Sequence, residues 1–183
     1  VTIFAGLSGA MVPAGMQECL IALLENRFID VLVSTGANIF HDICEHAGIR
    51  HYLGHHMVDD QDLFRQGIDR IYDVFAYEDQ FRGVDAKIAE FAEGLVGFSG
   101  SSADFIRQLG VWLTQKYPSK RSITATAARL NIPIFIPALC DSSIGIALVI
   151  ARRGGHQVMI DQLADTDQLT GYVEKAQKTG VIY

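Results

Sequence analysis

Short apolar segments that alternate with helical segments constrain this fold more than any other feature of the sequence. The apolar segments are uniformly hydrophobic, which is typical of strands buried on both faces of a sheet. We expect strands at residues 1–6, 28–34, 69–75, 133–137, 158–160 and 181–183. Helical spacing of apolar residues predicts helices at residues 14–26, 39–46, 79–93, 102–116, 122–130, 144–152 and 165–178. This alternation predicts an α/β fold with a doubly wound, mostly parallel sheet that has helices on both faces.

The domain organisation follows from the 183-residue length and from the two ends of the chain. This length suits a single domain, and no linker or internal repeat divides it. Residues 76–130 are largely helical and could form an insertion beside the sheet. Both ends of the chain read as core strands, whereas the termini of domains are usually peripheral. We therefore expect residues 1–183 to be one α/β domain that is truncated at both ends.

Charge and composition weigh against several classes of protein. The chain has 15 Lys and Arg against 21 Asp and Glu, a net charge of −6, whereas a nucleic-acid-binding protein needs a basic face. The longest apolar run, residues 144–151, is too short to span a membrane. Cys19, Cys44 and Cys140 have no paired spacing. This is typical of free thiols in a reducing, cytoplasmic setting, and we expect Cys140 to be a buried structural residue.

Three of the expected strands end in turns of small residues that lead into a helix. These turns are residues 6–10, 34–38 and 140–143. In an open parallel sheet, ligands bind beyond the carboxyl ends of the strands, and small residues let a ligand approach the backbone amides of a helix N-terminus. The three turns together favour a nucleotide-like ligand. Ordinary strand–helix turns remain the alternative, because no turn matches GxGxxG or a P-loop.

Polar side chains at this edge are the candidate site residues. Asp141 could bind a ribose hydroxyl or an amine, or it could cap the helix that follows. His41 and Asp42 follow the second strand, where they could contact a ligand. Alternatively, Asp42 is a helix cap and His41 is partly exposed. Five of the six histidines lie between residues 41 and 56, but their spacing does not fit a zinc site, so we expect no metal.

Four blocks of sequence lie in order along the chain: residues 3–15, residues 31–42 with the letters TGANIFHD, residues 67–73 and residues 132–145. Together they resemble the deoxyhypusine synthase-like family, and the version that carries a histidine at position 41 looks like its bacterial-type branch. The resemblance implies a Rossmann-like domain that binds NAD, in a homotetramer with active sites at subunit interfaces. It also implies a transferase that moves an aminobutyl group from a polyamine such as spermidine, through an imine on an enzyme lysine, to an amine acceptor. The acceptor in that family is a protein lysine, or putrescine in relatives that make homospermidine.

The resemblance also assigns residues. The positions that match NAD contacts of the family are Gly9, Ala10, Met11, Val12, Pro13, Thr35, Gly36, Ala37, Asp141 and Ser143. The substrate-binding positions are His41, Asp42 and Ile146, and His41 is the candidate proton carrier.

The chain departs from the family at the polyamine site. Phe40 and His41 replace two glutamates, and Ile146 replaces an aspartate. A cationic polyamine needs carboxylates to offset its desolvation, so these replacements weigh against spermidine as the substrate. The catalytic lysine is expected beyond residue 183. The alternatives are a homospermidine synthase-type enzyme acting on another amine and a non-catalytic paralogue that binds NAD or assembles with a partner.

Overall fold

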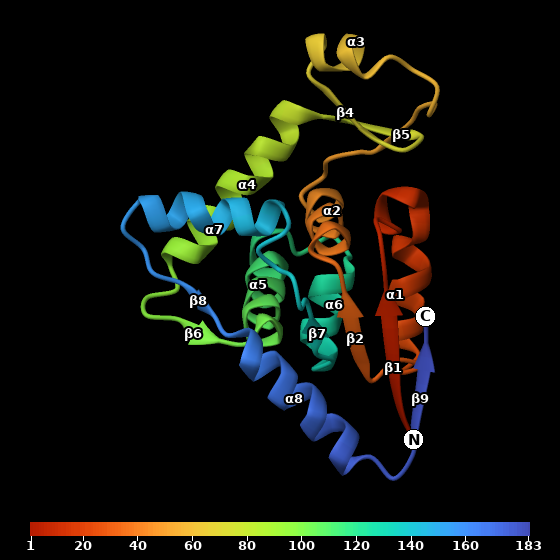
Figure 1. Ribbon diagram of the computed structural model, residues 1–183, viewed down its shortest axis with the longest axis vertical. Coiled ribbons are helices and arrows are strands. Elements are labelled where there is room, and N and C mark those ends of the chain that lie inside the picture. Colours follow the sequence, from red (N-terminus) through yellow and green to blue (C-terminus); the bar gives the residue numbers. More distant parts are fainter.

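A computed structural model describes all 183 residues and has a parallel sheet at its centre (Figure 1). Four strands form this sheet in the order β7-β2-β1-β9. Their bounds are β1 Thr2–Leu7, β2 Val31–Ser34, β7 Ile134–Phe135 and β9 Thr179–Ile182. The pairs β1–β2, β1–β9 and β2–β7 are all parallel, so the carboxyl ends of the four strands meet at one edge of the sheet.

The two faces of the sheet bury alternate residues of each strand. Ala5 of β1 pairs with Leu32 of β2, and both belong to the main hydrophobic core. The neighbouring pair, Phe4 and Val31, lies on the opposite face, where Leu169 of helix α8 (Gln162–Lys175) packs. Because helices cover both faces, the predicted doubly wound α/β architecture is confirmed.

Seven predicted helices are present, with ends that differ by a few residues. They are α1 Gln17–Glu25, α2 Gly36–His46, α4 Glu78–Glu93, α5 Ser102–Lys116, α6 Ile123–Leu130, α7 Ser143–Arg153 and α8 Gln162–Lys175. A short irregular helical segment, η1 (Val12–Met16), precedes α1. Buried side chains of α1, α2, α5 and α6 share one hydrophobic core with β1 and β2.

A small lobe lies beyond the carboxyl ends of the central strands (Figure 1). It contains α3 (Asp60–Arg65) and an antiparallel sheet of β3 (Tyr52–Leu53), β4 (Ile68–Ile71) and β5 (Val74–Tyr77). The prediction of one strand at residues 69–75 was therefore wrong. Tyr72 adopts a left-handed conformation, with φ of 57°, so the chain reverses tightly and two strands form a hairpin.

The predicted strand at residues 158–160 does not join the central sheet. It is β8 (Met159–Ile160), which pairs in parallel with β6 (Ser99–Gly100) at the side of the molecule. Because each of these strands has only two residues, an apolar segment could not reveal which sheet it would join.

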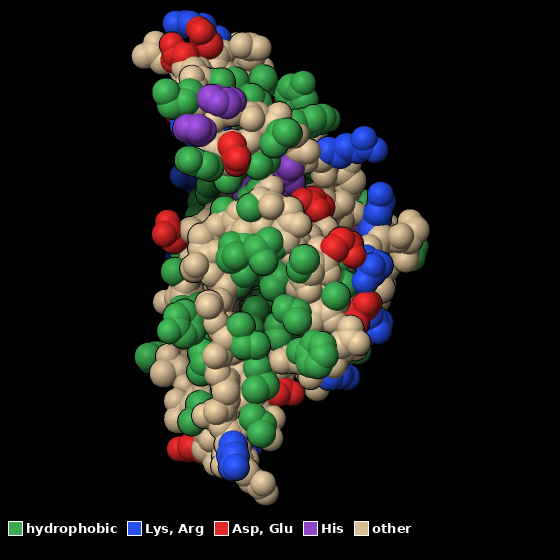
Figure 2. All heavy atoms as spheres, turned by 90° about the vertical axis from the view of Figure 1, so that its right-hand side faces the viewer, with side chains coloured by type: hydrophobic (Ala, Val, Ile, Leu, Met, Phe, Trp, Pro, Cys, Tyr) green, Lys and Arg blue, Asp and Glu red, His purple; other side chains and the backbone are tan.

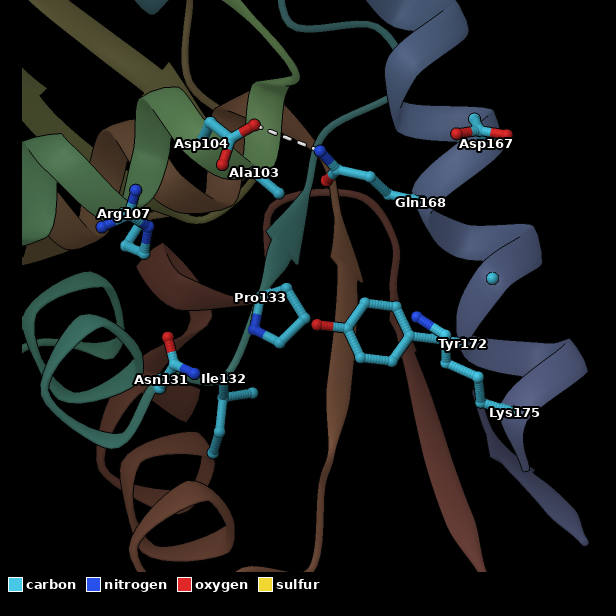
Figure 3. A pocket seen from close by; sticks show the side chains of 11 residues that line it. Ala103, Asp104, Arg107, Asn131, Ile132, Pro133, Asp167, Gln168, Tyr172 and Lys175 are labelled. Atoms are coloured by element: carbon cyan, nitrogen blue, oxygen red, sulfur yellow. Dashed lines mark hydrogen bonds between the residues drawn. The ribbon is translucent and has the colours of Figure 1, made fainter. Parts of the chain in front are cut away.

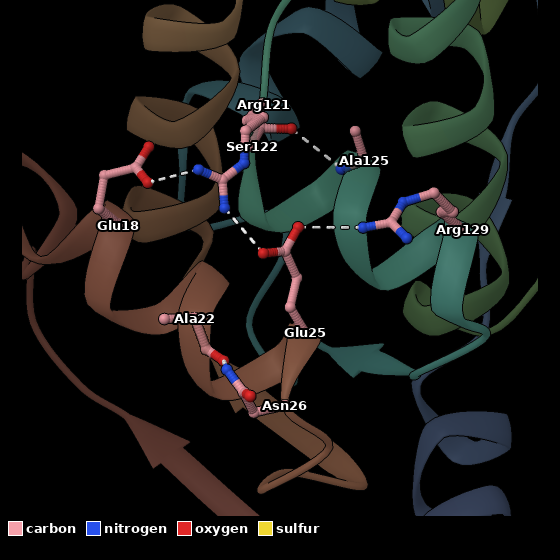
Figure 4. A network of polar contacts seen from close by, with 8 residues as sticks. All are labelled: Glu18, Ala22, Glu25, Asn26, Arg121, Ser122, Ala125 and Arg129. Atoms are coloured by element: carbon pink, nitrogen blue, oxygen red, sulfur yellow. Dashed lines mark hydrogen bonds and ion pairs between the residues drawn. The ribbon is translucent and has the colours of Figure 1, made fainter.

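Three ion pairs on the surface join helix α1 to α6 and to Arg121, which lies just before α6 (Figure 4). Arg121 contacts Glu18 at 2.9 Å and Glu25 at 2.8 Å, and Arg129 contacts Glu25 at 3.1 Å. These groups are partly exposed, so water screens their attraction.

Strand β9 forms an edge of the sheet and is exposed. Figure 2 looks at this side of the molecule and shows hydrophobic side chains gathered over the middle of the face. The exposed residues of this segment include Val181, Ile182 and Tyr183. None of the helices is both long and apolar enough to cross a membrane.

Candidate ligand site at the carboxyl edge of the sheet

A cavity of about 530 Å³ lies at the carboxyl edge of the central sheet. The turns that follow β1, β2 and β7 all contribute to its wall. Its lining residues are Gly6, Leu7, Ser8, Val33, Ser34, Thr35, Gly36, Pro137, Ala138, Asp141 and Tyr183. The three small-residue turns singled out in the sequence therefore converge on one cavity, whose size is in the range of small-molecule sites.

Thr35 connects two of these turns. It is the N-cap of α2, where its hydroxyl accepts a hydrogen bond from the amide of Asn38 at 3.2 Å. The same hydroxyl donates to the carbonyl of Gly9 at 2.7 Å. One side chain thus starts helix α2 and fixes the turn after β1 beside it.

Asn38 completes this connection and was missed by the sequence reasoning. It is fully buried, and its Oδ1 accepts a hydrogen bond from the amide of Val12 at 3.1 Å. Its Nδ2 donates to the carbonyls of Ser8 and Gly9 at 3.2 and 3.1 Å. An asparagine among the apolar residues of a helix was the available signal, because a buried amide needs partners.

Gly36 brings the first turn of α2 against the turn after β7. A Cβ at this position would collide with the side chain of Ser142. The amides of Gly36 and Ala37, at the start of α2, have no hydrogen-bond acceptor within the chain. Unpaired amides and the positive end of the helix dipole favour an anionic group at this point.

Asp141 offers a free carboxylate to the cavity. It is exposed and its side chain makes no hydrogen bond, so it does not cap α7. The N-cap of that helix is Ser142, whose hydroxyl donates to the carbonyl of Leu139 at 2.7 Å. Cys140 is exposed, so the expectation that it is buried was wrong. The turn after β7 places Cys140 outside the core, although the apolar strand before it is buried.

The other residues assigned to the cofactor lie around this cavity without lining it. The segment from Gly9 to Pro13 follows the lining residue Ser8, and Gly9 has a positive φ of 58°. Ala10 and Met11 are partly buried, whereas Val12 and Pro13 are buried. Ala37 and Ser143 are half-buried in the first turns of α2 and α7. Of the ten assigned positions, Thr35, Gly36 and Asp141 face the cavity directly.

Asp42 is fully buried and its carboxylate is surrounded by donors. The amides of Ile123 and Thr124 donate to it at 2.7 and 2.8 Å, and the Thr124 hydroxyl donates at 2.7 Å. Gln17 Nε2 donates at 2.8 Å. Burial raises the pKa of the Asp42 carboxyl, and these hydrogen bonds oppose that rise. Asp42 caps a helix, as one reading of the sequence had it, but the helix is α6 rather than its own.

His41 directly precedes Asp42 on α2, and its side chain points into different surroundings. Its Nδ1 lies 2.8 Å from His51 Nε2, and His51 Nδ1 lies 3.0 Å from Glu45 Oε1. His41 is 7% exposed, and its ring packs edge-on against Phe40 and Phe81. Burial, followed by the charge of His51, lowers the pKa of His41 to about 4, so His41 is neutral at neutral pH.

Ile146 is on the outer face of α7. It is 56% exposed, and Val149 and Ile150 on the same face are also exposed. The spacing of three and four residues makes a continuous apolar stripe along the helix. Such a stripe is typical of a surface that another protein segment covers.

A second cavity, of about 500 Å³, lies between α5 and α8 (Figure 3). Its wall carries charged groups, among them Asp104, Arg107 and Lys175. It also includes Asn131 to Pro133, which precede β7, so this cavity is toward the amino end of that strand. Ligands of open parallel sheets bind at the opposite edge, and none of the predicted site residues lines this cavity.

The fold and the first cavity define an α/β protein with a candidate ligand site at the carboxyl edge of a parallel sheet. Comparison with known proteins makes this class specific. The family model for deoxyhypusine synthase matches residues 1–183, and the chain therefore belongs to the deoxyhypusine synthase family. The family resemblance inferred from the four sequence blocks is confirmed.

Relatives in this family include archaeal and bacterial proteins. The chain is 52% identical over 182 residues to "Probable deoxyhypusine synthase 2" of Methanosarcina acetivorans, a match that covers 100% of this chain and 53% of the relative. It is 38% identical to "Deoxyhypusine synthase-like protein" of Chlorobaculum tepidum, with 96% of this chain and 51% of the relative covered. The chain thus spans about half the length of these relatives, and it is homologous to members of a transferase family.

A solved structure agrees with the fold. A crystal structure of a candidate deoxyhypusine synthase from Entamoeba histolytica superimposes with a TM-score of 0.76 at 19% identity. The match covers 99% of this chain and 56% of that one. At this identity the likeness supports the α/β fold with its parallel sheet.

Proposed function

We propose that this chain is the NAD-binding part of a deoxyhypusine synthase-like transferase that moves an aminoalkyl group from a polyamine to an amine acceptor. The observation that carries the proposal is the cavity in which Thr35, Gly36 and Asp141 meet at the carboxyl edge of the sheet. Membership of the deoxyhypusine synthase family supports the class of reaction.

The cavity residues fit NAD. The unpaired amides of Gly36 and Ala37 suit its pyrophosphate, and the free carboxylate of Asp141 suits a ribose hydroxyl. NAD, when bound, supplies an acceptor and later a donor of hydride. The hydrogen bonds of Thr35 and Asn38 hold the surrounding turns in place before the cofactor arrives, which lowers the entropic cost of binding.

The substrate side differs from a typical polyamine site. His41 is a neutral acceptor rather than a carboxylate, Asp42 is committed to α6, and Ile146 is apolar. These three positions favour an amine other than spermidine, as in a homospermidine synthase-type enzyme. His41 contacts the amine in this proposal, and Asp42 acts at a distance by fixing α2.

A lysine that forms an imine with the substrate is expected outside this segment. Lys116 pairs with Glu90 and lies over Trp112, and Lys87 lies over Tyr117. None of the lysines of the chain lines the cavity at the carboxyl edge. The relatives are about twice as long as this chain, which leaves room for the lysine in the remaining sequence.

Assembly into a homotetramer with sites at subunit interfaces is part of the proposal. The apolar stripe of Ile146, Val149 and Ile150 begins five residues after Asp141 and is exposed. Covering this stripe with another subunit would close the side of α7 near the cavity. The acceptor amine, which could be a lysine of a protein, would then enter between subunits. A single-subunit mass in solution would contradict this part of the proposal.

The test uses the full-length protein with NAD and a panel of diamines and polyamines, and follows the absorbance of reduced cofactor. We expect reduced NAD with at least one amine, and a matched Asp141→Ala variant that binds NAD at least tenfold more weakly by calorimetry. If the protein bound NAD but no amine produced reduced NAD, the transferase proposal would be contradicted. A non-catalytic paralogue that binds NAD would then be the better description.

The amine preference has its own test. A His41→Glu, Ile146→Asp double variant restores two carboxylates and should bind spermidine more tightly, because carboxylates offset the desolvation of ammonium groups. Calorimetry with spermidine measures the change, and a Val149→Asp variant, which adds a carboxylate elsewhere on the same helix, is the control. Equal affinities in the wild type and the double variant would contradict this account of specificity.

A further inference from the structure

The hydrogen-bonded row Glu45–His51–His41 has one open end. Nε2 of His41 makes no hydrogen bond in the chain and is not among the buried polar atoms that lack a partner, so it retains accessible surface. We propose that His51 and Glu45 are positioning residues that hold His41 in a single tautomer, with the lone pair on Nε2 available to accept a hydrogen bond and then a proton from the amine substrate. This inference rests on the proposed function.

The tautomer follows from which groups can donate. A carboxylate only accepts hydrogen bonds, so the proton in the 3.0 Å contact between Glu45 and His51 is on His51 Nδ1. A neutral imidazole carries one ring proton, which makes His51 Nε2 an acceptor. The 2.8 Å contact between His51 Nε2 and His41 Nδ1 therefore has its proton on His41. Nε2 of His41 is left as the unprotonated atom.

The packing keeps this row in place. The ring of Phe81 contacts His41 and His51, with centroid distances of 5.3 and 6.2 Å. The His51 side chain is 7% exposed, whereas that of Glu45 is 29% exposed. Water is therefore largely excluded from the contact between the rings and has access to the carboxylate, and a hydrogen bond in such a dry setting is strengthened.

The location of His41 relates the row to the ligand cavity. Gly36 lines the cavity and His41 is five residues further along α2, which is roughly 7–8 Å along the helix axis. His51 begins the segment that leads into the lobe, and this lobe lies beyond the carboxyl edge of the sheet (Figure 1). A substrate between the cavity and the lobe would pass close to His41.

The proposed step moves protons only and needs no oxidant. The substrate ammonium loses an N–H proton to His41 Nε2, and the substrate nitrogen keeps the electron pair. His41 passes its Nδ1 proton to His51 Nε2, and His51 passes its Nδ1 proton to Glu45 Oε1. Both rings end neutral, and the partly exposed carboxyl group of Glu45 returns the proton to solvent. The amine is left with a free electron pair, as loss of hydride from its neighbouring carbon requires.

Other titratable groups near α2 are separate from this row. Asp42 is on the same helix but is held by Ile123 and Thr124 of α6. Asp85 of α4 is close enough to Cys44 of α2 to raise the pKa of its thiol, after burial as the main cause. Among the titratable groups, His51 is the one whose interaction lowers the pKa of His41, after burial as the main cause.

The first experiment reads the tautomer directly and does not depend on activity. Full-length protein labelled with nitrogen-15 histidine is studied by proton–nitrogen correlation at neutral pH, and a His41→Gln variant assigns the His41 signals. We expect the Nδ1–H form of His41 in the wild type and a mixture of tautomers in His51→Ala. An Nε2–H form of His41 in the wild type would overturn the inference.

The second experiment separates positioning from simple structural support. With the amine that reduces NAD, His51→Ala should lower kcat about tenfold or more while KM changes little. His51→Gln, whose amide can accept from His41 and donate to Glu45 but cannot relay a proton, should keep the Nδ1–H form of His41 and recover only part of kcat. Exposed His56→Ala is the control. Unchanged kcat in His51→Ala would overturn the inference. Failure of the wild type to oxidise any amine would instead overturn the proposed function, and the tautomer spectra would still decide how His51 and Glu45 act on His41.

Discussion

The two sides of helix α2 show how neighbouring polar residues acquire different roles. Asp42 faces α6, where four donors saturate its carboxylate and no surface remains. His41 faces the junction with the lobe, where one ring nitrogen is held by His51 and the other is open. A closed hydrogen-bond network stabilises the fold, whereas a network with an open end can bind or move a proton. The predictions below test this contrast.

The largest effect is expected on the closed side. Asp42→Ala leaves the amides of Ile123 and Thr124 without acceptors in a buried setting, and we expect a loss of about 3–5 kcal/mol in the free energy of unfolding. Urea denaturation of the full-length protein measures the loss. Asp141→Ala is the matched control, because its exposed carboxylate makes no hydrogen bond and its removal should cost less than about 0.5 kcal/mol. A loss below about 1 kcal/mol in Asp42→Ala would contradict the closed-network description.

The next effect concerns pH and the open side. The folded-state pKa of His41 is about 4, whereas a histidine in an unfolded chain titrates near 6.5. The unfolded state therefore binds more protons between these two values, and stability rises with pH there. The contribution of His41 is complete above pH 6.5 and is lost as the pH falls to 4, by at most about 3 kcal/mol.

The variant His41→Gln isolates this contribution. His46, whose pKa is also lowered by burial, acts in the same direction, and Asp85, whose pKa burial raises to about 6, acts in the opposite one. His46 and Asp85 are present in both proteins. A difference between the wild type and His41→Gln in how the free energy of unfolding changes with pH is therefore due to His41 and its partners. Urea denaturation across this pH range measures it, with His56→Gln as the control. Parallel slopes in the wild type and His41→Gln would refute the expectation.

A smaller effect is expected at the first turn of α2, which precedes both Asp42 and His41 on the helix. Thr35→Val removes the N-cap and the hydrogen bond to Gly9, and we expect a loss of about 1–2 kcal/mol in stability together with weaker NAD binding. The control is Thr170→Val, since the hydroxyl of Thr170 contacts only the carbonyl of Thr166 within α8. Denaturation and calorimetry measure the two effects. If the Thr35→Val variant were less stable but bound NAD with normal affinity, the N-cap would not contribute to the ligand site, contrary to this prediction.

The smallest effect is expected at the exposed part of the contact between α1 and α6. Glu25→Gln removes two ion pairs, with Arg121 and Arg129, that are open to water (Figure 4). We expect a loss of at most about 1 kcal/mol, and a smaller loss in high salt. Glu90→Gln, which removes a single exposed pair with Lys116, is the comparison. A loss as large as that in Asp42→Ala would show that exposure does not distinguish the two contacts.

Much of the fold could be predicted because periodicity reports burial along one segment. The seven helices and the strands of the central sheet follow from that pattern, as do the three turns at its carboxyl edge. The hairpin at Tyr72 and the pairing of β8 with β6 could not be predicted. The first depends on one residue with a left-handed backbone, and the second depends on which short strand lies nearby in space.

The candidate site also has features that the sequence predicted and features that it could not predict. Residue types and their order along the chain determined the family, the α/β class and the edge of the sheet where a ligand would bind. Only the tertiary structure decided that Asp42 is sealed against α6, that Asn38 ties the turns together, and that His51 and Glu45 meet His41. The physical reason is that a hydrogen bond needs two groups within about 3 Å, and partners up to 82 positions apart reach that distance only when the helices pack.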